Sequence, residues 1–326
     1  MLKKGLWFGI CFSVWLLGLA LASPTFVLRY NHVLGPTHPY HAGFELWAQR
    51  VYERTNGNLQ ILVFHSAALG VEEDIIEQLR KGVPIGQNTD GARMGMYVRE
   101  LGVFNAPYFL ADFEMVERAA TLPAVQQWLD QLVSEFGIRV LCFNWVQGYR
   151  HFMTNVPVRH PNDLAGLLIR TPPAPVWVES VRALGATPVA LPFGEIYSAI
   201  QLRAVDGAEL VYANIPDKSL WEVIRYVNET RHFLLTNFQV VGEAWFVQLP
   251  EDYQRILVEE CHAAGRETSR RIEENSERIK QEIQQRGMVI VSDVDLDAFR
   301  QASLAAYEVL GLTEVRNLIH RQLGLE

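Results

Sequence analysis

The chain has 326 residues, with 29 Lys and Arg against 37 Asp and Glu, and 49% of its residues are hydrophobic. This composition excludes a disordered, collagen-like or low-complexity protein. The net charge of −8 and the lack of recurring basic runs argue against a nucleic-acid partner. The length is typical of about two domains and is enough to bury a core without disulfides.

The first 22 residues have the pattern of a secretory signal peptide. Lys3 and Lys4 precede an uncharged, mostly apolar stretch, and small residues stand at the two positions that signal peptidase reads, the second being Ala22. The stretch is short for a membrane span, although an uncleaved anchor is the alternative. We expect cleavage after Ala22, export to the periplasm, and a mature chain that begins at Ser23 and has no further apolar span.

Two cysteines lie beyond this segment. Cys142 falls in an apolar run, which predicts a buried strand residue, whereas Cys261 falls in a helical pattern far along the chain. An exported protein permits a disulfide, and the sequence alone does not establish one. Because the two residues belong to separate elements, we expect their thiols to be unpaired.

Beyond the signal, strand patterns alternate with helix patterns. Alternating apolar residues predict strands, and helical spacing that ends at glycine or at basic residues predicts helices. In chain order, we predict a strand at 27–30, a helix from 44 to the Asn56-Gly57 turn, a strand at 59–63, a helix at 72–80, a helical stretch at 113–136, a strand at 138–143, a strand at 167–171, a helix at 176–184, a strand at 187–191, a helix at 194–203 and a β-rich stretch at 233–248. This order predicts α/β layers over a largely parallel sheet.

The segment from Pro250 to Arg286 predicts one helix of unusual length. Proline and acidic residues begin it, and Gly287 ends it. At 1.5 Å per residue such a helix spans roughly 55 Å, which exceeds the width of a domain of ~150 residues. It must therefore protrude, kink at Gly265, or lie across two domains, and the last option fits a two-domain chain.

Common enzyme and metal motifs are missing from the sequence. It has no glycine-rich phosphate loop, no Gly-x-Ser-x-Gly nucleophile and no Cys-x-x-Cys pair. His38 and His41 stand three apart near a proline turn, but no Cys or Asp lies nearby to complete a metal site. The sequence therefore predicts no catalysis, no metal and no cofactor.

Two arginines stand among apolar strand residues. A guanidinium such as that of Arg150 or Arg170 is costly in these surroundings unless it has a partner. Its planar fork suits two-point contact with a ligand carboxylate. A structural ion pair with Glu195, Asp206 or Glu209 is the equally favoured alternative.

Six motifs, in order, resemble those of the periplasmic solute-binding proteins of TRAP (tripartite ATP-independent periplasmic) transporters, of the C4-dicarboxylate-binding type. They are NLQILVFH (58–65) with LGVE (69–72), GVFNAPY (102–108), DLAGLLIR (163–170), ALGATP (183–188), PFGEIY (192–197) and VDGAE (205–209). The resemblance covers nearly the whole mature chain. It implies two α/β lobes around a ligand cleft with a long helix crossing both. We assign lobe I to 23–147 plus 236–275, and lobe II to 148–235 plus 276–326.

The resemblance also implies particular ligand contacts. Arg170 matches the arginine that grips the ligand carboxylate, and Arg150 matches a second, supporting arginine. Phe193 matches an aromatic wall residue. Glu72 and Asp90 match positions of the first lobe that meet the far end of the ligand.

The sequence departs from the family after the Asp-Gly-x-Glu motif. The family usually has Asn-Pro there, whereas this chain has Leu210 and Val211, so a usual amide contact is lost and the ligand class is open. Glu72, Asp90 and Glu209 suit hydroxyl groups and would repel a second carboxylate. We therefore expect a hydroxylated monocarboxylate, such as a sugar acid, rather than a C4-dicarboxylate, although helix capping is an alternative role for Glu72.

The candidate ligand contacts also include the position of Leu210 itself, together with Asn31, His32, Trp145 and Asn237. Trp145 and Tyr212 either stack on the ligand or fill the core. The predicted function is capture of an organic acid by domain closure and its delivery to the small and large integral membrane subunits of a TRAP transporter. A secreted hydrolase of a small acid and the binding protein of an ATP-driven importer are the alternatives.

Overall fold

The computed structural model describes residues 24–325, so the predicted signal peptide and its cleavage site lie outside the described residues. Strands are β1 (Phe26–Asn31), β2 (Leu59–Phe64), β3 (Ile85–Asp90), β4 (Ile138–Thr154), β5 (Leu168–Thr171), β6 (Thr187–Ala190), β7 (Gly207–Val211), β8 (Tyr226–Gly242) and β9 (Val289–Val291). Helices are α1 (Pro39–Arg54), α2 (Glu72–Arg80), α3 (Gly91–Met94), α4 (Phe113–Ala120), α5 (Pro123–Phe136), α6 (Pro175–Ala183), α7 (Ile196–Gln201), α8 (Asn214–Lys218), α9 (Glu243–Phe246), α10 (Glu251–Gln285), α11 (Leu296–Leu310) and α12 (Thr313–Leu323). Short 3₁₀ segments lie at Arg99–Asn105, Pro161–Leu164, Phe193–Glu195 and Leu220–Glu222.

One mixed sheet connects the whole molecule. Its strand order is β2-β1-β3-β8-β4-β7-β5-β6, with β9 beside β8. The outer strands pair in parallel on both sides, as predicted, whereas β3 with β8, β8 with β4, and β4 with β7 are antiparallel. The prediction of a largely parallel sheet is wrong at the centre because β4 and β8 run in opposite directions between the two sides.

The strands β4 and β8 join two lobes. Lobe I is the half that contains β2, β1 and β3, and lobe II is the half that contains β7, β5 and β6. Each joining strand has 17 residues, which is far longer than the strand predicted at 138–143. Register shifts interrupt their pairing at several points, and such bulges let a strand bend and twist as it crosses. Our lobe boundaries at 147 and 235 fall inside these strands.

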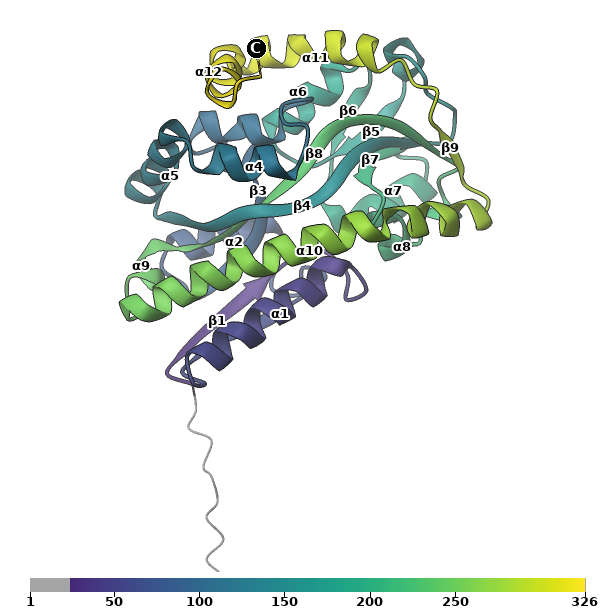
Figure 1. Cartoon of the computed structure of the whole chain (residues 1–326). Coiled ribbons are helices and arrows are strands. Elements are labelled where there is room, and N and C mark those ends of the chain that lie inside the picture. The colour runs from purple at the N-terminus through teal and green to yellow at the C-terminus, as the bar shows by residue number, and fades with distance from the viewer. Residues whose placement is uncertain (1–23, 326) are drawn as a thin grey trace, which may run out of the picture.

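The long helix α10 is continuous over 35 residues. Figure 1 shows it running along the molecule beside β4, with α1 next to its first half. Gly265 does not interrupt it. A Cβ at Gly265 would lie 2.7 Å from the Asn144 and Trp145 side chains, so glycine here lets the helix approach the strand closely. Of the three options for this helix, the structure has the one that crosses both lobes.

The cysteine prediction is wrong, because Cys142 and Cys261 form a disulfide. The residues are 119 positions apart in sequence, but α10 crosses β4 and brings their Cα atoms to 6.1 Å. Trp145 lies beside the bridge and donates its indole N–H to the Cys261 carbonyl at 3.1 Å. The disulfide therefore fastens the first half of α10 to lobe I.

Other boundaries differ from the sequence prediction for local reasons. The first helix begins at Pro39 rather than at 44, since proline suits the first turn and the His38 side chain accepts from the Tyr40 N–H as a cap. The stretch 113–136 is two helices, and Pro123 begins the second. Asn56 and Gly57 have positive φ angles, as the turn prediction requires.

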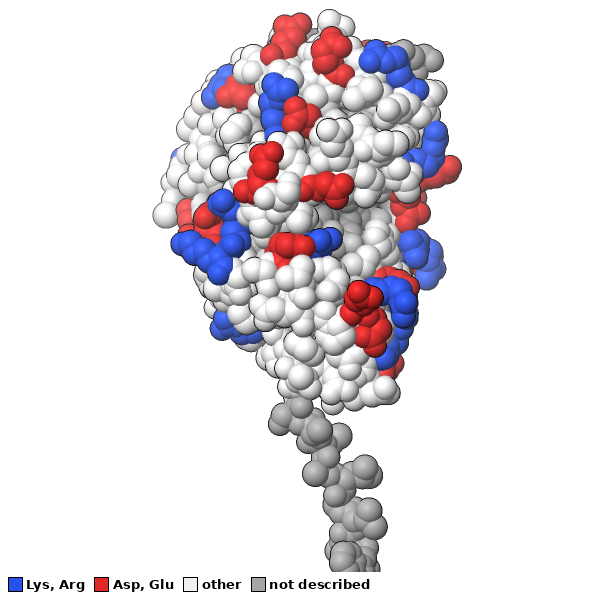
Figure 2. Space-filling model, turned by 90° about the vertical axis from the view of Figure 1, so that its left-hand side faces the viewer, with Lys and Arg blue, Asp and Glu red and all other residues white. Residues whose placement is uncertain are grey.

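The surface carries both signs of charge. On the face shown in Figure 2, basic and acidic side chains are interspersed among uncharged residues. Such a surface gives little long-range attraction for an anion, so the affinity for one must come from local groups.

Candidate functional site

A small cavity of about 50 Å³ lies between the lobes. Its walls come from the carboxyl ends of strands in both lobes, which is where α/β sheets usually bind ligands. Six of the predicted contacts line it: Glu72, Asp90, Arg150, Arg170, Phe193 and Asn237. The other lining residues are Val33, Leu34, Asn88, Arg93, Gln147, Pro172, Asn214 and Leu235.

Arg170 is a buried cation near the end of β5, with 2% of its surface exposed. Its Nε donates to the Leu191 carbonyl at 2.9 Å. Among residues 24–325, no carboxylate lies within ion-pair distance of this guanidinium. Burial, together with the neighbouring Arg150, lowers the pKa of Arg170 to about 9, so it stays charged at neutral pH. The cavity thus contains a positive charge that lacks a direct counter-ion.

Arg150, in contrast, is held by the protein. Its Nε donates to the Glu209 carboxylate, one Nη donates to the Glu209 carbonyl, and the guanidinium lies 4.9 Å from the centre of the Trp177 ring. Glu209 also accepts from the Thr171 hydroxyl at 2.8 Å. The structural ion pair that we considered for both arginines therefore exists at Arg150 and not at Arg170.

In lobe I, the acidic residues surround Arg93. Its guanidinium forms ion pairs with Glu72 and Glu73, each at 2.8 Å, and with Asp90. Asp90 also caps α3 by accepting from the Arg93 backbone N–H at 2.8 Å. Burial and the adjacent acids raise the pKa of Glu72 to about 8 in spite of Arg93. A carboxyl group with a raised pKa takes up a proton more readily, and in its protonated form it donates a hydrogen bond as well as accepting one.

Five of the predicted contacts do not line the cavity. Glu209 faces Arg150 and Thr171, and Leu210 is fully buried in a hydrophobic cluster on the other side of β7. Trp145 stacks on Phe44 in the core of lobe I. The remaining two are Asn31, which bonds to Gln87 and to the loop at Leu69 and Gly70, and His32, whose Nε2 lies 3.1 Å from His41 Nδ1.

Four polar lining residues were not predicted from the sequence: Asn88, Arg93, Gln147 and Asn214. Arg93 stands three residues after Asp90. On a helix this spacing places both side chains on one turn, so the sequence could have predicted that Arg93 lies beside Asp90. Gln147 reaches the cavity because β4 bulges at Gly148, which has φ +94 and which a strand pattern does not reveal. Asn214 supplies an amide to the cavity wall four residues after Leu210, where the usual family amide is missing.

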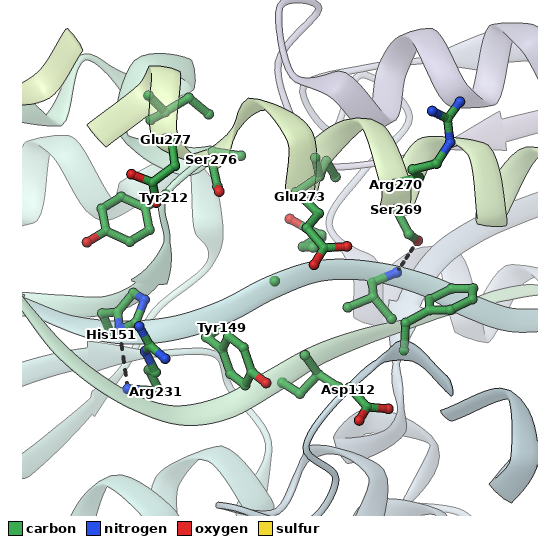
Figure 3. A pocket seen from close by; sticks show the side chains of 18 of the residues that line it. Asp112, Tyr149, His151, Tyr212, Arg231, Ser269, Arg270, Glu273, Ser276 and Glu277 are labelled. Atoms are coloured by element: carbon green, nitrogen blue, oxygen red, sulfur yellow. Dashed lines mark hydrogen bonds between the residues drawn. The ribbon is translucent and has the colours of Figure 1, made fainter. Parts of the chain in front are cut away.

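A larger cavity of about 830 Å³ lies on the opposite face of β4 and β8, beneath α10. Figure 3 shows Glu273 of α10 across this crevice from Tyr149, with Arg231 beside His151. Tyr212 also lines the crevice, where its hydroxyl donates to Glu229, so it does not face the small cavity. The paired strands separate the two cavities, and Gln147 borders both.

Within the described part of the chain, no group of three or more His, Cys, Asp or Glu side chains is placed to hold a metal ion. His38 caps α1, and His41 pairs with His32 rather than with His38. No helix among residues 24–325 is long and apolar enough to cross a membrane.

The family is established by comparison with known proteins. The family described as "Bacterial extracellular solute-binding protein, family 7" (DctP) matches residues 30–311, and the chain belongs to it. This confirms the predicted family, the two-lobe α/β fold and the role of a TRAP periplasmic solute-binding protein, and it favours that role over the hydrolase and the ATP-driven importer. Members of the family bind substrates and are periplasmic.

Individual relatives differ in what they bind. A TRAP periplasmic solute-binding protein from Escherichia fergusonii, solved in an open ligand-free form, is 31% identical with a TM-score of 0.80, covering 91% of this chain and 99% of its own. The 2,3-diketo-L-gulonate-binding periplasmic protein of Escherichia coli is 24% identical over 90% of both chains. The C4-dicarboxylate-binding periplasmic protein of Rhodobacter capsulatus is 29% identical over 72% of this chain and 69% of its own.

Proposed function

We propose that the protein binds an organic acid with one carboxylate and several hydroxyl groups in the cavity between its lobes. It then delivers this acid to the small and large membrane subunits of a TRAP transporter. The observation that carries the proposal is the buried Arg170 guanidinium, which has no carboxylate within ion-pair distance in the described residues. A ligand carboxylate would supply the counter-charge through two parallel hydrogen bonds.

The charge balance on the lobe I side disfavours a second carboxylate. Arg93 already has three carboxyl partners in Glu72, Glu73 and Asp90. A second ligand carboxylate would approach these acids without an unpaired cation to receive it, and like charges at short range cost several kcal/mol in an interface. Hydroxyl groups meet no such repulsion. This supports a sugar acid over a C4-dicarboxylate.

Polar groups of the cavity are suited to hydroxyls. The Gln147 side-chain oxygen is buried and has no hydrogen-bond partner in the described structure, while its amide nitrogen donates to Asn237 at 2.7 Å. An unsatisfied buried acceptor costs about 1–3 kcal/mol, which a ligand hydroxyl could recover. Asn88, Asn214 and Glu72 provide further polar groups at the walls.

Uptake requires the lobes to move. A volume of about 50 Å³ accommodates only a few water-sized molecules, so a six-carbon acid enters with the lobes or the lining side chains apart. The crossings through β4, β8 and α10 are suited to a hinge. Closure then removes water and strengthens the pair between Arg170 and the carboxylate. The protein's role is binding and release rather than catalysis, and residues 1–22 would direct its export and be removed in the process.

A thermal-shift panel tests the ligand class. D-gluconate and D-glucarate form a matched pair, since they share a hydroxylated chain and differ in having one or two carboxylates. L-gulonate and 2,3-diketo-L-gulonate extend the first class, and succinate and malate the second. At 100 times its dissociation constant a ligand adds about 2.7 kcal/mol, a shift of several degrees. The proposal expects shifts with monocarboxylates only, and shifts confined to diacids refute it.

The same samples distinguish binding of the acid from its chemical conversion. NMR spectra of the best ligand, recorded after prolonged incubation with the protein, should show the acid unchanged. Conversion into a product would favour the hydrolase alternative. Mass spectrometry of protein recovered from the periplasm should find an N-terminus near Ser23, whereas an intact Met1 in the membrane fraction would contradict the proposed export.

A further inference from the structure

Two segments outside the predicted site meet beside the cavity. One is the segment 33–38 that follows β1 in lobe I, and the other is α8, which follows β7 in lobe II. Val33 and Leu34 of the first segment line the cavity, as does Asn214 of the second. A contact between these segments therefore bridges the two lobes at the edge of the cavity.

The contact is a hydrogen bond between the lobes. The Gly35 backbone N–H donates to Asp217 Oδ2 at 3.1 Å, across 182 positions of sequence. Only 1% of the Asp217 side chain is exposed. Burial raises the pKa of Asp217, whereas the Gly35 N–H, Lys218 and the Thr37 hydroxyl act in the opposite direction. A buried carboxylate depends on such donors, because it has lost its water.

The approach is close at Gly35. A Cβ there would lie 2.3 Å from Asp217 Oδ1, so a side chain at this position would displace the Asp217 carboxylate from the Gly35 N–H. On the lobe II side, the Lys218 ammonium lies 4.8 Å from the centre of the Phe193 ring, and Phe193 lines the cavity. Helix α8 is thereby connected both to the opposite lobe and to the cavity wall.

We propose that Asp217 is a positioning residue that holds the two lobes closed by accepting the Gly35 N–H, without touching the ligand. Separation of the lobes breaks this bond and returns the carboxylate to water, so the contact exists only in the closed form. A contact of this kind raises the closed population, and the apparent affinity rises in proportion. The inference rests on the proposed function only in treating the cavity as the ligand site.

Interlobe distances in the free protein test the proposal without any ligand. Leu62 of β2 is 37% exposed and Leu202 after α7 is 78% exposed, so Leu62→Cys with Leu202→Cys offers one spin-label position in each lobe. Asp217→Ala should shift the distance distribution toward longer values. Asp217→Asn keeps a side-chain oxygen acceptor and should retain the distribution of the parent. Identical distributions in the parent and in Asp217→Ala overturn the proposal.

Release kinetics provide the second readout, with L-gulonate as the probe. Asp217→Ala should release L-gulonate about tenfold faster than wild type or more, and Asp217→Asn should stay close to wild type. Gly35→Ala should also speed the release of L-gulonate. The double variant Gly35→Ala with Asp217→Ala should release it no faster than Asp217→Ala alone, because shortening Asp217 removes the clash with the new Cβ. Equal release from wild type and Asp217→Ala overturns the role of Asp217. A wild type that binds no L-gulonate counts against the proposed ligand class instead, and the distances still decide this inference.

Discussion

Replacement of Arg170 by lysine separates its role in binding from a role in stability. Arg170→Lys keeps a positive group but loses the fork that presents two parallel donors to one carboxylate. The burial and the neighbouring Arg150 that lower the pKa of the arginine to about 9 would lower the pKa of a lysine there as well. The variant should therefore lose part of its charge together with its geometry.

The expected loss of binding follows from the burial of the site. Removing one partner of a buried, hydrogen-bonded charge pair costs about 2–5 kcal/mol, which is roughly 30- to 5,000-fold in affinity. Because a lysine with a lowered pKa gains charge as the pH falls, the variant should bind its ligand more tightly at pH 6 than at pH 8. Calorimetric titration with the best acid of the thermal-shift panel measures both effects.

Melting of the free protein provides the control. Arg170 has no carboxylate within ion-pair distance among the described residues, so Arg170→Lys should not lower the melting temperature in the absence of ligand. Arg150→Lys should lower it, because Arg150 neutralises the buried Glu209, and should weaken binding less. Arg231→Lys, on the crevice side of the strands, should change neither quantity. Wild-type affinity in Arg170→Lys would show that Arg170 is not the carboxylate anchor, as would a loss of apo stability with nearly unchanged affinity.

Three further predictions concern stability. Unreduced, denatured protein should show no free thiol at Cys142 or Cys261, and two titratable thiols would contradict the disulfide. Replacing both cysteines by serine should lower the free energy of unfolding by up to about 4–5 kcal/mol, because the disulfide closes a long loop in the unfolded chain. The folded state raises the pKa of Glu72 from 4.5 to about 8, so folded protein retains a proton that the unfolded chain releases, and wild type should lose stability from about pH 5 to pH 8. The melting temperature of Glu72→Gln should not show this loss. The same pH dependence of the melting temperature in wild type and Glu72→Gln would contradict the prediction. Gly265→Ala should destabilise the protein by about 1–3 kcal/mol, measured by urea titration, because the new Cβ meets Trp145. Gly194→Ala is the control and should be nearly neutral, since no atom lies within 4 Å of a Cβ there. Equal effects of the two substitutions would contradict the close approach of α10 to β4.

The fold was predictable where local patterns decide it. The helix at 72–80 and the strand that begins at 59 agree with α2 and β2, and the glycine-ended 250–286 pattern agrees with α10 to within a residue at each end. The length of β4 was not predictable, because Gln147 and Gly148 interrupt the apolar alternation where the strand bulges and crosses between lobes. Strand direction at the centre also depends on long-range pairing that no local pattern contains.

The site was predictable in part, for a similar reason. Arg150 and Arg170 have the same apolar strand context, and only the pairing of β4 with β7, which sets Phe152 opposite Glu209, gives Arg150 its carboxylate. The disulfide depends likewise on which helix covers which strand. The resemblance to the solute-binding family supplied the candidate positions, and the tertiary structure supplied their partners.

A crystal structure with the acid that gives the largest thermal shift would show directly whether Arg170 binds the ligand carboxylate. We expect the ligand carboxylate within hydrogen-bond distance of the Arg170 Nη atoms, with ligand hydroxyls at Gln147 and Asn237 and no carboxylate beside Asp90. A carboxylate bound instead beside Arg93, or a ligand seated in the crevice beneath α10, would contradict it.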